Sequence, residues 1–170
     1  MPAISSLRSQ RLSELRTDIG QQYVAFRMRL AWFILPVKSI YRVIPLEKTI
    51  PKLTVVGQNV PIVDLGKLLF AQTQTAANTV QPLIVNGARV VSKPCLVVVR
   101  SQTDDLVGIL SNSQPALQKI LQDDLVPLPQ TYVQRWKVDF ITSMTIPSKE
   151  RPSLFAIDSD RLASKILHTK

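Results

Sequence analysis

The chain is constrained most by a succession of short apolar segments separated by turn-forming residues. The clearest begins at Tyr23, where apolar and other residues take alternate positions: Val24, Phe26, Met28 and Leu30 against Ala25, Arg27 and Arg29. A two-residue period predicts a β-strand with one face buried and the other in water. Further strands are predicted at 32–36, 39–44, 53–56, 60–63, 82–85, 90–91, 95–100, 106–110, 132–144 and 153–158, with an extended segment at 125–129. Residues 116–121 fit either a helical turn or a strand.

Two of these strands lead into the same kind of helix start. Residues 62–69 (IVDLGKLL) align with residues 156–163 (AIDSDRLA) at an offset of 94, each with an aspartate just after the strand. An aspartate at such a junction accepts hydrogen bonds from the unpaired N–H groups of the first helical turn. Asp64 and Asp158 are therefore predicted to cap helices at 65–70 and 160–167. This interpretation outweighs that of a carboxylate pair for acid–base catalysis.

The pattern as a whole predicts a mainly β fold. Many short strands joined by short turns favour small barrels over a parallel sheet, and the matched aspartate segments indicate two β-rich halves related by pseudo-symmetry. Residues 4–19 place apolar side chains and arginines in one helical arc, which predicts a weakly docked or partner-dependent helix in an N-terminal extension, 1–20. Residues 71–82 are small and polar and are expected to form a linker or mobile loop.

Composition excludes several classes of function. The 170 residues are 45% apolar, which suits one domain with a sizeable core, but they include only five glycines, one cysteine and one histidine. No phosphate-loop, metalloprotease or nucleophile-elbow motif is present. Cys95 is expected to be a buried, inert thiol, and a catalytic pair with His168 is disfavoured because His168 lies near the chain end. We expect no enzyme activity, metal, disulfide or cofactor.

The sequence also predicts where the protein works. No apolar run approaches the roughly 20 residues needed to span a bilayer. Charged residues interrupt residues 1–20, unlike a signal peptide. We expect a cytoplasmic protein without membrane insertion, in a reducing compartment.

The chain is basic, with 21 Lys and Arg against 12 Asp and Glu, a formal charge of +9. Residues 1–60 hold nine basic and three acidic residues, residues 61–130 hold five and five, and residues 131–170 hold seven and four. Nucleic acid is one class of partner for such a chain, but the basic residues are interspersed and the middle is neutral. Arg27 and Arg29, on the expected wet face of one strand, fit either an acidic partner surface or an ordinary solvated face.

In this order of elements, residues 23–167 resemble the CheW family of chemotaxis coupling proteins. The segment YVAFRMRLAWFILPVKSIYRVIPL (23–46) follows the family's first strand and its segment leading to V-x-E-V-I, with Ile40, Val43 and Ile44 in the apolar places. The family continues with R-G-x-x-(I/V)-P-(I/V)-(I/V)-D-L, and here Val56 and Gly57 lead into NVPIVDL. The remaining segments follow the family's second half: VGILSN (107–112), DDLVPLP (123–129) and LFAIDSDRLAS (154–164).

The resemblance implies two five-stranded β-barrels packed on a shared core, with short helices after the Asp-capped strands and a C-terminal helix. It implies one domain over 21–168, with halves at 21–80 and 81–150 and with 151–168 packing back on the first half. It further implies a non-catalytic adaptor that couples a chemoreceptor-type sensor to a CheA-type histidine kinase through barrel edges and the groove between barrels. The partner-binding residues expected on these grounds are Arg27, Arg29, Ile40, Arg42, Val43, Val56 and Gly57.

Departures from the family pattern bear on the choice of partner. The acidic residue of V-x-E-V-I falls on Arg42, and the arginine before the glycine falls on Val56, which removes a bidentate donor. The stretch from Pro45 to Gly57 is also shorter than the family's. We predict a divergent coupling protein in a chemotaxis, phototaxis or pilus-motility pathway, whose partner presents an acidic surface to the three arginines 27, 29 and 42. The alternatives are a basic nucleic-acid-binding β-barrel module, which steep salt dependence identifies, and a self-associating scaffold.

Overall fold

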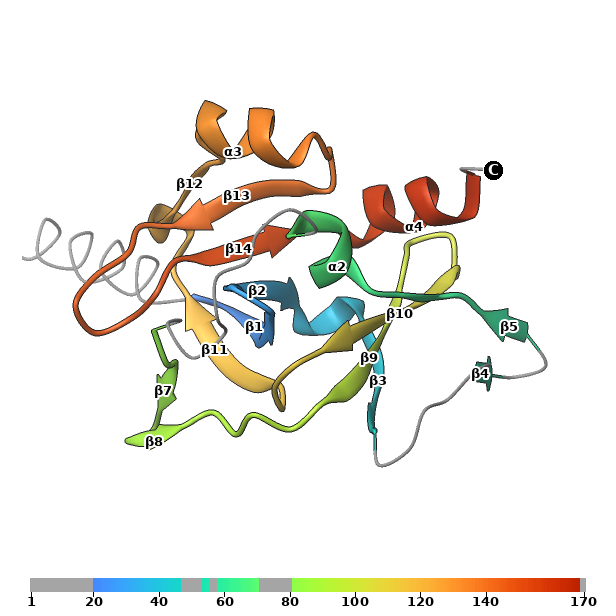
Figure 1. The fold of residues 1–170 in the computed structure, drawn as a ribbon, viewed down its shortest axis with the longest axis horizontal. Helices are drawn as coiled ribbons and strands as arrows, with labels where there is room; N and C mark the ends of the chain where they lie inside the picture. Colours follow the sequence, from blue (N-terminus) through green and yellow to red (C-terminus); the bar gives the residue numbers. More distant parts are fainter. Residues whose placement is uncertain (1–19, 47–52, 56–57, 71–80, 169–170) are drawn as a thin grey trace, which may run out of the picture.

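The computed structural model describes residues 20–46, 53–55, 58–70 and 81–168. Over these ranges the chain is mainly β, as predicted, and most strands belong to two sheets (Figure 1). The helix predicted at 4–19 and most of the loop predicted at 71–82 lie outside the described residues.

The larger sheet has six strands in the order β11-β1-β2-β14-β13-β12. Its neighbouring strands are antiparallel except β14 and β2, which run parallel. The strands are β1 (Gln21–Met28), β2 (Ala31–Pro36), β11 (Ala116–Ile120), β12 (Leu125–Pro127), β13 (Ile141–Thr145) and β14 (Leu154–Ile157). The segment for which the sequence allowed a helical turn or a strand is thus strand β11.

The smaller sheet has four strands in the order β3-β9-β10-β6, and only β6 and β10 run parallel. Its strands are β3 (Ile40–Pro45), β6 (Ile62–Val63), β9 (Cys95–Arg100) and β10 (Leu106–Ser111). Two ribbons complete the strands: β4 (Leu53–Val55) with β5 (Gln58–Val60), and β7 (Ile84–Val85) with β8 (Ala88–Arg89). Within the described ranges β3 pairs with β9 alone, so its outer edge carries no strand.

The two sheets do not coincide with the predicted halves, 21–80 and 81–150. β1 and β2 join β11 to β14, whereas β3 and β6 join β9 and β10. The division into halves stays a prediction. β2 of the first half takes its second neighbour, β14, from residues 151–168, because an edge strand of a local hairpin keeps a row of unpaired backbone groups. Two closed five-stranded barrels stay a prediction, since the described residues form sheets of six and four strands.

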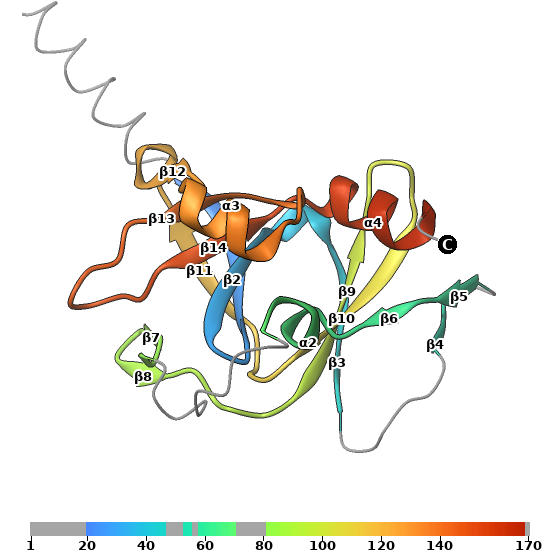
Figure 2. The same ribbon diagram turned by 45° about the horizontal axis from the view of Figure 1, so that its top comes forward.

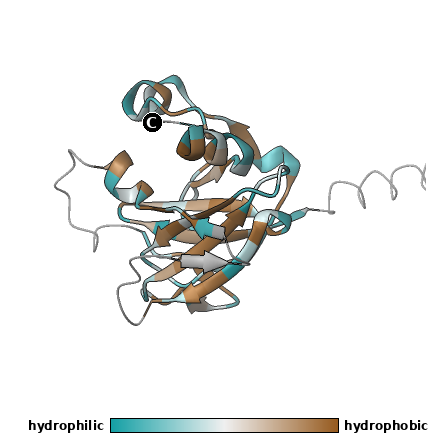
Figure 3. Cartoon of the chain, turned by 90° about the vertical axis from the view of Figure 1, so that its right-hand side faces the viewer, coloured by the Kyte–Doolittle hydropathy of each residue, from teal (hydrophilic) through white to brown (hydrophobic). Residues whose placement is uncertain are grey.

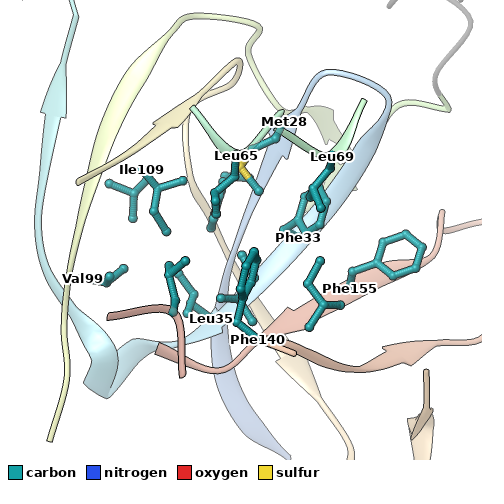
Figure 4. Packing of buried hydrophobic residues seen from close by; sticks show 14 of the residues in the cluster. Met28, Phe33, Leu35, Leu65, Leu69, Val99, Ile109, Phe140 and Phe155 are labelled. Carbon is teal, nitrogen blue, oxygen red and sulfur yellow. The ribbon is translucent and has the colours of Figure 1, made fainter. Parts of the chain in front are cut away.

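The main core lies between the two sheets, and helices complete it (Figure 2). The helices are α2 (Leu65–Leu69), α3 (Gln130–Trp136) and α4 (Ser159–His168), and short 3₁₀ turns lie at η1 (Val37–Ser39) and η3 (Gln122–Asp124). Figure 4 shows side chains from strands of both sheets and from α2 pointing into this core, with Phe33 and Phe140 near its centre. Apolar residues follow the strands, as the brown colouring of Figure 3 shows.

β1 is buried on both faces. Val24, Phe26 and Met28 face the main core as predicted, but Ala25 on the opposite face is also fully buried. A second apolar cluster covers that opposite face, and its members come from the segment around β7 and β8 as well as from the sheet: Leu83, Val85 and Val90 pack with Tyr23, Ala25, Trp32 and Ile34. The prediction of a wet face was wrong because the residues that cover it lie far along the chain.

Helix α3 occupies the first part of the strand predicted at 132–144, and β13 begins only at Ile141. Tyr132 and Trp136 stand one helical turn apart, so both rings reach Phe155, with centroids 5.0 and 4.9 Å from its ring. Aromatic residues favour strands in isolation, and this packing outweighs that preference. Lys137 ends the helix in a left-handed conformation, with φ of 53°.

The two matched aspartates occupy equivalent positions. Asp64 Oδ1 accepts a hydrogen bond from the Lys67 N–H at 2.9 Å, and Asp158 Oδ1 accepts from the N–H groups of Asp160 and Arg161 at 3.0 and 3.1 Å. Both are contacts of a helix N-cap. The strands before them, β6 and β14, are also the ones that pair in parallel, so the sequence match corresponds to a shared strand–cap–helix unit.

We expect Asp158→Ala to lower the free energy of unfolding by about 1–2 kcal/mol, because two N–H groups at the start of α4 lose their acceptor. Asp158→Ser keeps most of the stability, since a serine oxygen also caps. Urea unfolding followed by circular dichroism measures both. The control is Asp123→Ala, at an exposed position of η3, with an expected change within about 0.5 kcal/mol. Equal stabilities for Asp158→Ala and Asp123→Ala contradict the capping role.

Candidate functional site

Three of the predicted partner-binding residues, Ile40, Arg42 and Val43, lie on β3, the edge strand of the smaller sheet. Ile40 is half-buried against the main core, whereas Arg42 and Val43 are exposed. Pro45 ends the strand, a residue that sheets tolerate at edges because it has no N–H to pair. β3 therefore combines an open backbone edge with apolar and cationic side chains.

Two residues that the sequence motifs did not single out lie beside them, Tyr41 on β3 and Arg100 on the neighbouring strand β9. Tyr41 is 37% exposed and lies where the pairing register of β3 shifts. The Arg100 Cζ lies over the Tyr41 ring, 5.6 Å from its centroid, which is a cation–π contact. The signal for Arg100 was present in the sequence, because this arginine ends the otherwise apolar segment that starts at Cys95. No signal in the sequence indicated the contact of Arg100 with Tyr41, because β3 and β9 lie far apart along the chain and meet only in the folded structure.

A groove of about 480 Å³ opens beside the end of β3. It lies between the end of β3 and two segments far along the chain, and its lining includes Val43, Pro45, Leu46, Lys93, Pro94 and Pro115. The Leu46 N–H donates to the Pro94 carbonyl at 3.2 Å, which holds one wall to the other. A groove with apolar walls and one lysine can accept an apolar side chain of a partner next to an acidic one.

Arg27 lies near the end of β1 and Arg29 in the β1–β2 turn, and both are half-buried. The Arg27 N–H donates to Ser113 Oγ at 2.9 Å, and its carbonyl accepts from the Asn112 N–H at 2.7 Å. The Arg29 N–H donates to Asn112 Oδ1 at 2.6 Å, and its side chain lies against Gly66 at the start of α2. These contacts tie the turn to the segment after β10, so the two arginines connect elements of the fold in addition to any contact with a partner.

The structure therefore places the predicted basic residues in two groups. Arg42 lies on the edge of the smaller sheet, and Arg27 and Arg29 lie at a turn of the larger one. Val56 and Gly57, the other two predicted residues, lie outside the described residues.

In the ranges that the structure covers, no group of three or more His, Cys, Asp or Glu side chains is placed to hold a metal ion. Cys95 is 3% exposed, and burial raises the pKa of its thiol even though the Ser111 hydroxyl opposes that shift. A raised pKa keeps the thiol protonated and unreactive. Cys95 is thus a packing residue of β9.

We expect Cys95 to react slowly with a thiol reagent such as DTNB in the native protein and rapidly after unfolding. Because folding raises the thiol pKa, the stability that the protonated thiol provides is complete below the usual pKa of cysteine and is lost as the pH rises through the folded pKa. The release of thionitrobenzoate with time, with and without denaturant, measures the reactivity of the Cys95 thiol. Rapid labelling of the native protein at neutral pH contradicts it, and the Cys95→Ser variant is the blank.

Comparison with protein-family models matches residues 22–166 to the CheW-like domain. The chain belongs to the CheW-like domain family. The match runs from β1 into α4, so the CheW-like domain includes both sheets and the helices α2 to α4. It confirms the resemblance that the motifs at 23–46, 59–65 and 154–164 indicated. Membership of this family supports a chemotaxis signal-transduction adaptor.

Among solved structures, the CheW-like domain is similar to the crystal structure of the scaffolding protein TtCheW from Thermoanaerobacter tengcongensis. The two chains share 15% sequence identity with a TM-score of 0.53, and the likeness covers 81% of this chain and 84% of that chain. At this identity the likeness shows the fold. No curated protein matches the sequence. None of the helices in the described ranges has the length and apolar composition needed to cross a bilayer.

Proposed function

We propose that this protein is a non-catalytic cytoplasmic adaptor that couples a chemoreceptor-type sensor to a CheA-type histidine kinase, in a chemotaxis, phototaxis or pilus-motility pathway. The observation that carries the proposal is the family match over residues 22–166. The geometry is compatible with it, because an open strand edge and an apolar groove provide affinity through main-chain pairing and side-chain burial without any reaction.

The proposed contact set keeps the seven residues that the sequence indicated. Ile40, Arg42 and Val43 offer the β3 edge, and the groove beside Pro45 adds apolar area to it. Arg27 and Arg29 offer a second position at the β1–β2 turn, and Val56 and Gly57 are included on the family motif alone. Arg42 stands where the family has an acidic residue, so the partner is proposed to present an acidic surface to it.

A capture experiment tests the proposal. The tagged full-length protein is incubated with its cognate CheA-type kinase and receptor at about 0.05 and about 0.5 M salt, since exposed charges are screened at the higher value. We expect capture of both at low salt and weaker capture at high salt. If the folded protein captures neither, the adaptor function is wrong. Salt-sensitive retention of labelled DNA or RNA then identifies the nucleic-acid alternative, and a larger apparent mass in size-exclusion chromatography identifies a self-associating scaffold.

A further inference from the structure

Arg42 and Arg100 lie on one face of the smaller sheet. Arg42 is paired with Val98 on β9, and Arg100 follows Val98 by two residues on the same strand. Side chains two residues apart on a strand point to the same face, and diagonal neighbours on adjacent strands come within reach of long side chains. The two side chains are therefore diagonal neighbours on one face of the sheet, with Arg42 on the edge strand β3 and Arg100 on β9.

Tyr41 completes this group. It lies at the register shift of β3, and the Arg100 guanidinium stacks over its exposed ring at 5.6 Å. This cation–π contact uses none of the guanidinium N–H donors, which stay available to a carboxylate. We call Tyr41, Arg42 and Arg100 the β3 strip.

Arg100 is only loosely held by the protein itself. Its Nε lies 4.0 Å from Asp104 Oδ1, and the two side chains are 48% and 86% exposed. Ion pairs this long and this exposed add little to stability. Arg100 can thus exchange Asp104 for a carboxylate of a partner at small cost, and Asp104 acts as a weak competitor at the site.

The strands of the smaller sheet contain no Asp or Glu. Residues 20–46, 53–55, 58–63 and 81–103 contain no Asp or Glu, although they include seven arginines and lysines. The carboxylates near Arg100 come from the turn that holds Asp104 and Asp105 and from the start of α4, where Asp158 and Asp160 line a pocket together with Arg100. None of them lies on a strand beside Arg42. The outer backbone edge of β3 carries no strand within the described ranges, so the same place offers unpaired main-chain groups.

We propose that the β3 strip binds an extended acidic segment of the partner protein, which adds as a strand to the outer edge of β3 and places carboxylates on Arg42 and Arg100. The assignment rests on the proposed adaptor function and extends it by two residues, Tyr41 and Arg100, and by a mode of binding. Main-chain pairing gives such a complex affinity, and alternate side chains give it specificity. The acidic character of the partner follows from charge complementarity along the strip.

The test uses the full-length chain and a fluorescein-labelled synthetic peptide of alternating valine and glutamate, with a valine–lysine peptide as the reversed-charge probe. Fluorescence anisotropy is expected to show that the protein binds the valine–glutamate peptide and does not bind the valine–lysine peptide. Arg100→Gln is expected to weaken it about tenfold, the loss of one charge-assisted hydrogen bond. Arg100→Lys recovers only part of the affinity, since a lysine lacks the planar fork. Asp104→Asn removes the competitor and tightens binding.

Arg89→Gln is the matched control, because it removes the same charge from an exposed arginine on β8. If Arg89→Gln and Arg100→Gln lose the same affinity for the glutamate peptide, the proposed role of the β3 strip is wrong and the binding is general charge attraction. Amide NMR shifts on adding the peptide are expected for residues 40–45, and shifts confined to other strands also overturn it. Circular dichroism checks that each variant is folded.

Capture of the cognate kinase and receptor separates this proposal from the adaptor function. If wild type and Arg100→Gln capture both proteins equally well, the proposed binding by the β3 strip is wrong and the proposed adaptor function is retained. If the glutamate peptide binds through Arg100 and neither protein is captured, the proposed adaptor function is wrong and the proposed binding by the β3 strip is retained.

Discussion

We expect Phe33→Ala to lower the free energy of unfolding by about 3–5 kcal/mol, the range for removing a buried aromatic ring. Phe33 is fully buried in the middle of β2 (Figure 4), with its ring centroid 5.7 Å from that of Phe155 and 6.1 Å from that of Trp136. These rings are held by other neighbours, so the space left by the phenyl group closes only in part. Because the free energy of unfolding of small domains is about 5–15 kcal/mol, the variant loses a large fraction of its stability.

Urea unfolding followed by tryptophan fluorescence and circular dichroism measures this loss, and Trp136 reports directly on the affected cluster. Phe33→Leu is expected to lose less, since leucine fills part of the space. Ile146→Ala is the control because its side chain is 62% exposed, and its effect is expected to stay within about 0.5 kcal/mol. A midpoint for Phe33→Ala equal to that of Ile146→Ala contradicts the placement of the core between the two sheets.

We expect Leu83→Asp to lower the free energy of unfolding by about 4 kcal/mol or more, because it removes a buried leucine and buries an unpaired carboxylate. Leu83 is 1% exposed and packs on the outer face of the larger sheet against Trp32 and Ile34. Its neighbour Ile84 is 51% exposed. Ile84→Asp is therefore the matched control, with the same chemical change one residue away and an effect expected within about 0.5 kcal/mol.

Hydrogen exchange locates the damage. Faster exchange in β1, β2 and β14 of Leu83→Asp is expected, because these strands lose their cover on one face. The Trp32 indole N–H is a sensitive probe, since it donates to the Gln81 carbonyl at 2.9 Å beside the covering segment. Equal stability and exchange for the two aspartate variants show that the segment at 81–91 does not cover the sheet in solution.

The β-strand pattern shows how far sequence reasoning reaches. The alternation from Val24 to Met28 correctly identified the residues of β1 that face the main core, because a strand has a fixed period of two. It missed the burial of Ala25, because burial depends on what else reaches that face. The failure at Tyr132–Trp136 has the same origin: the residues favour a strand locally, and contacts with Phe155 decide for a helix.

The site divides in the same way. The family motif placed Ile40, Arg42 and Val43 on one strand, and all three lie on β3. Nothing in the motif indicated Tyr41 or Arg100, because their contact depends on the pairing of β3 with β9 across a long stretch of chain. The sequence prediction grouped Arg27 and Arg29 with Arg42 because all three are basic. In the fold, Arg42 lies on the smaller sheet and the other two belong to the larger one.

The sequence by itself determined the fold class, the two aspartate-capped units and the family, because strand period, cap chemistry and motif order are local or ordered along the chain. The tertiary structure alone decided which strands share a sheet, which face of β1 is covered and which cations stand together. These depend on pairing between distant segments, where main-chain hydrogen bonds carry no sequence signature of their own. The proposed choice of partner belongs to that second group, since Tyr41, Arg42 and Arg100 come together only once β3 and β9 have paired.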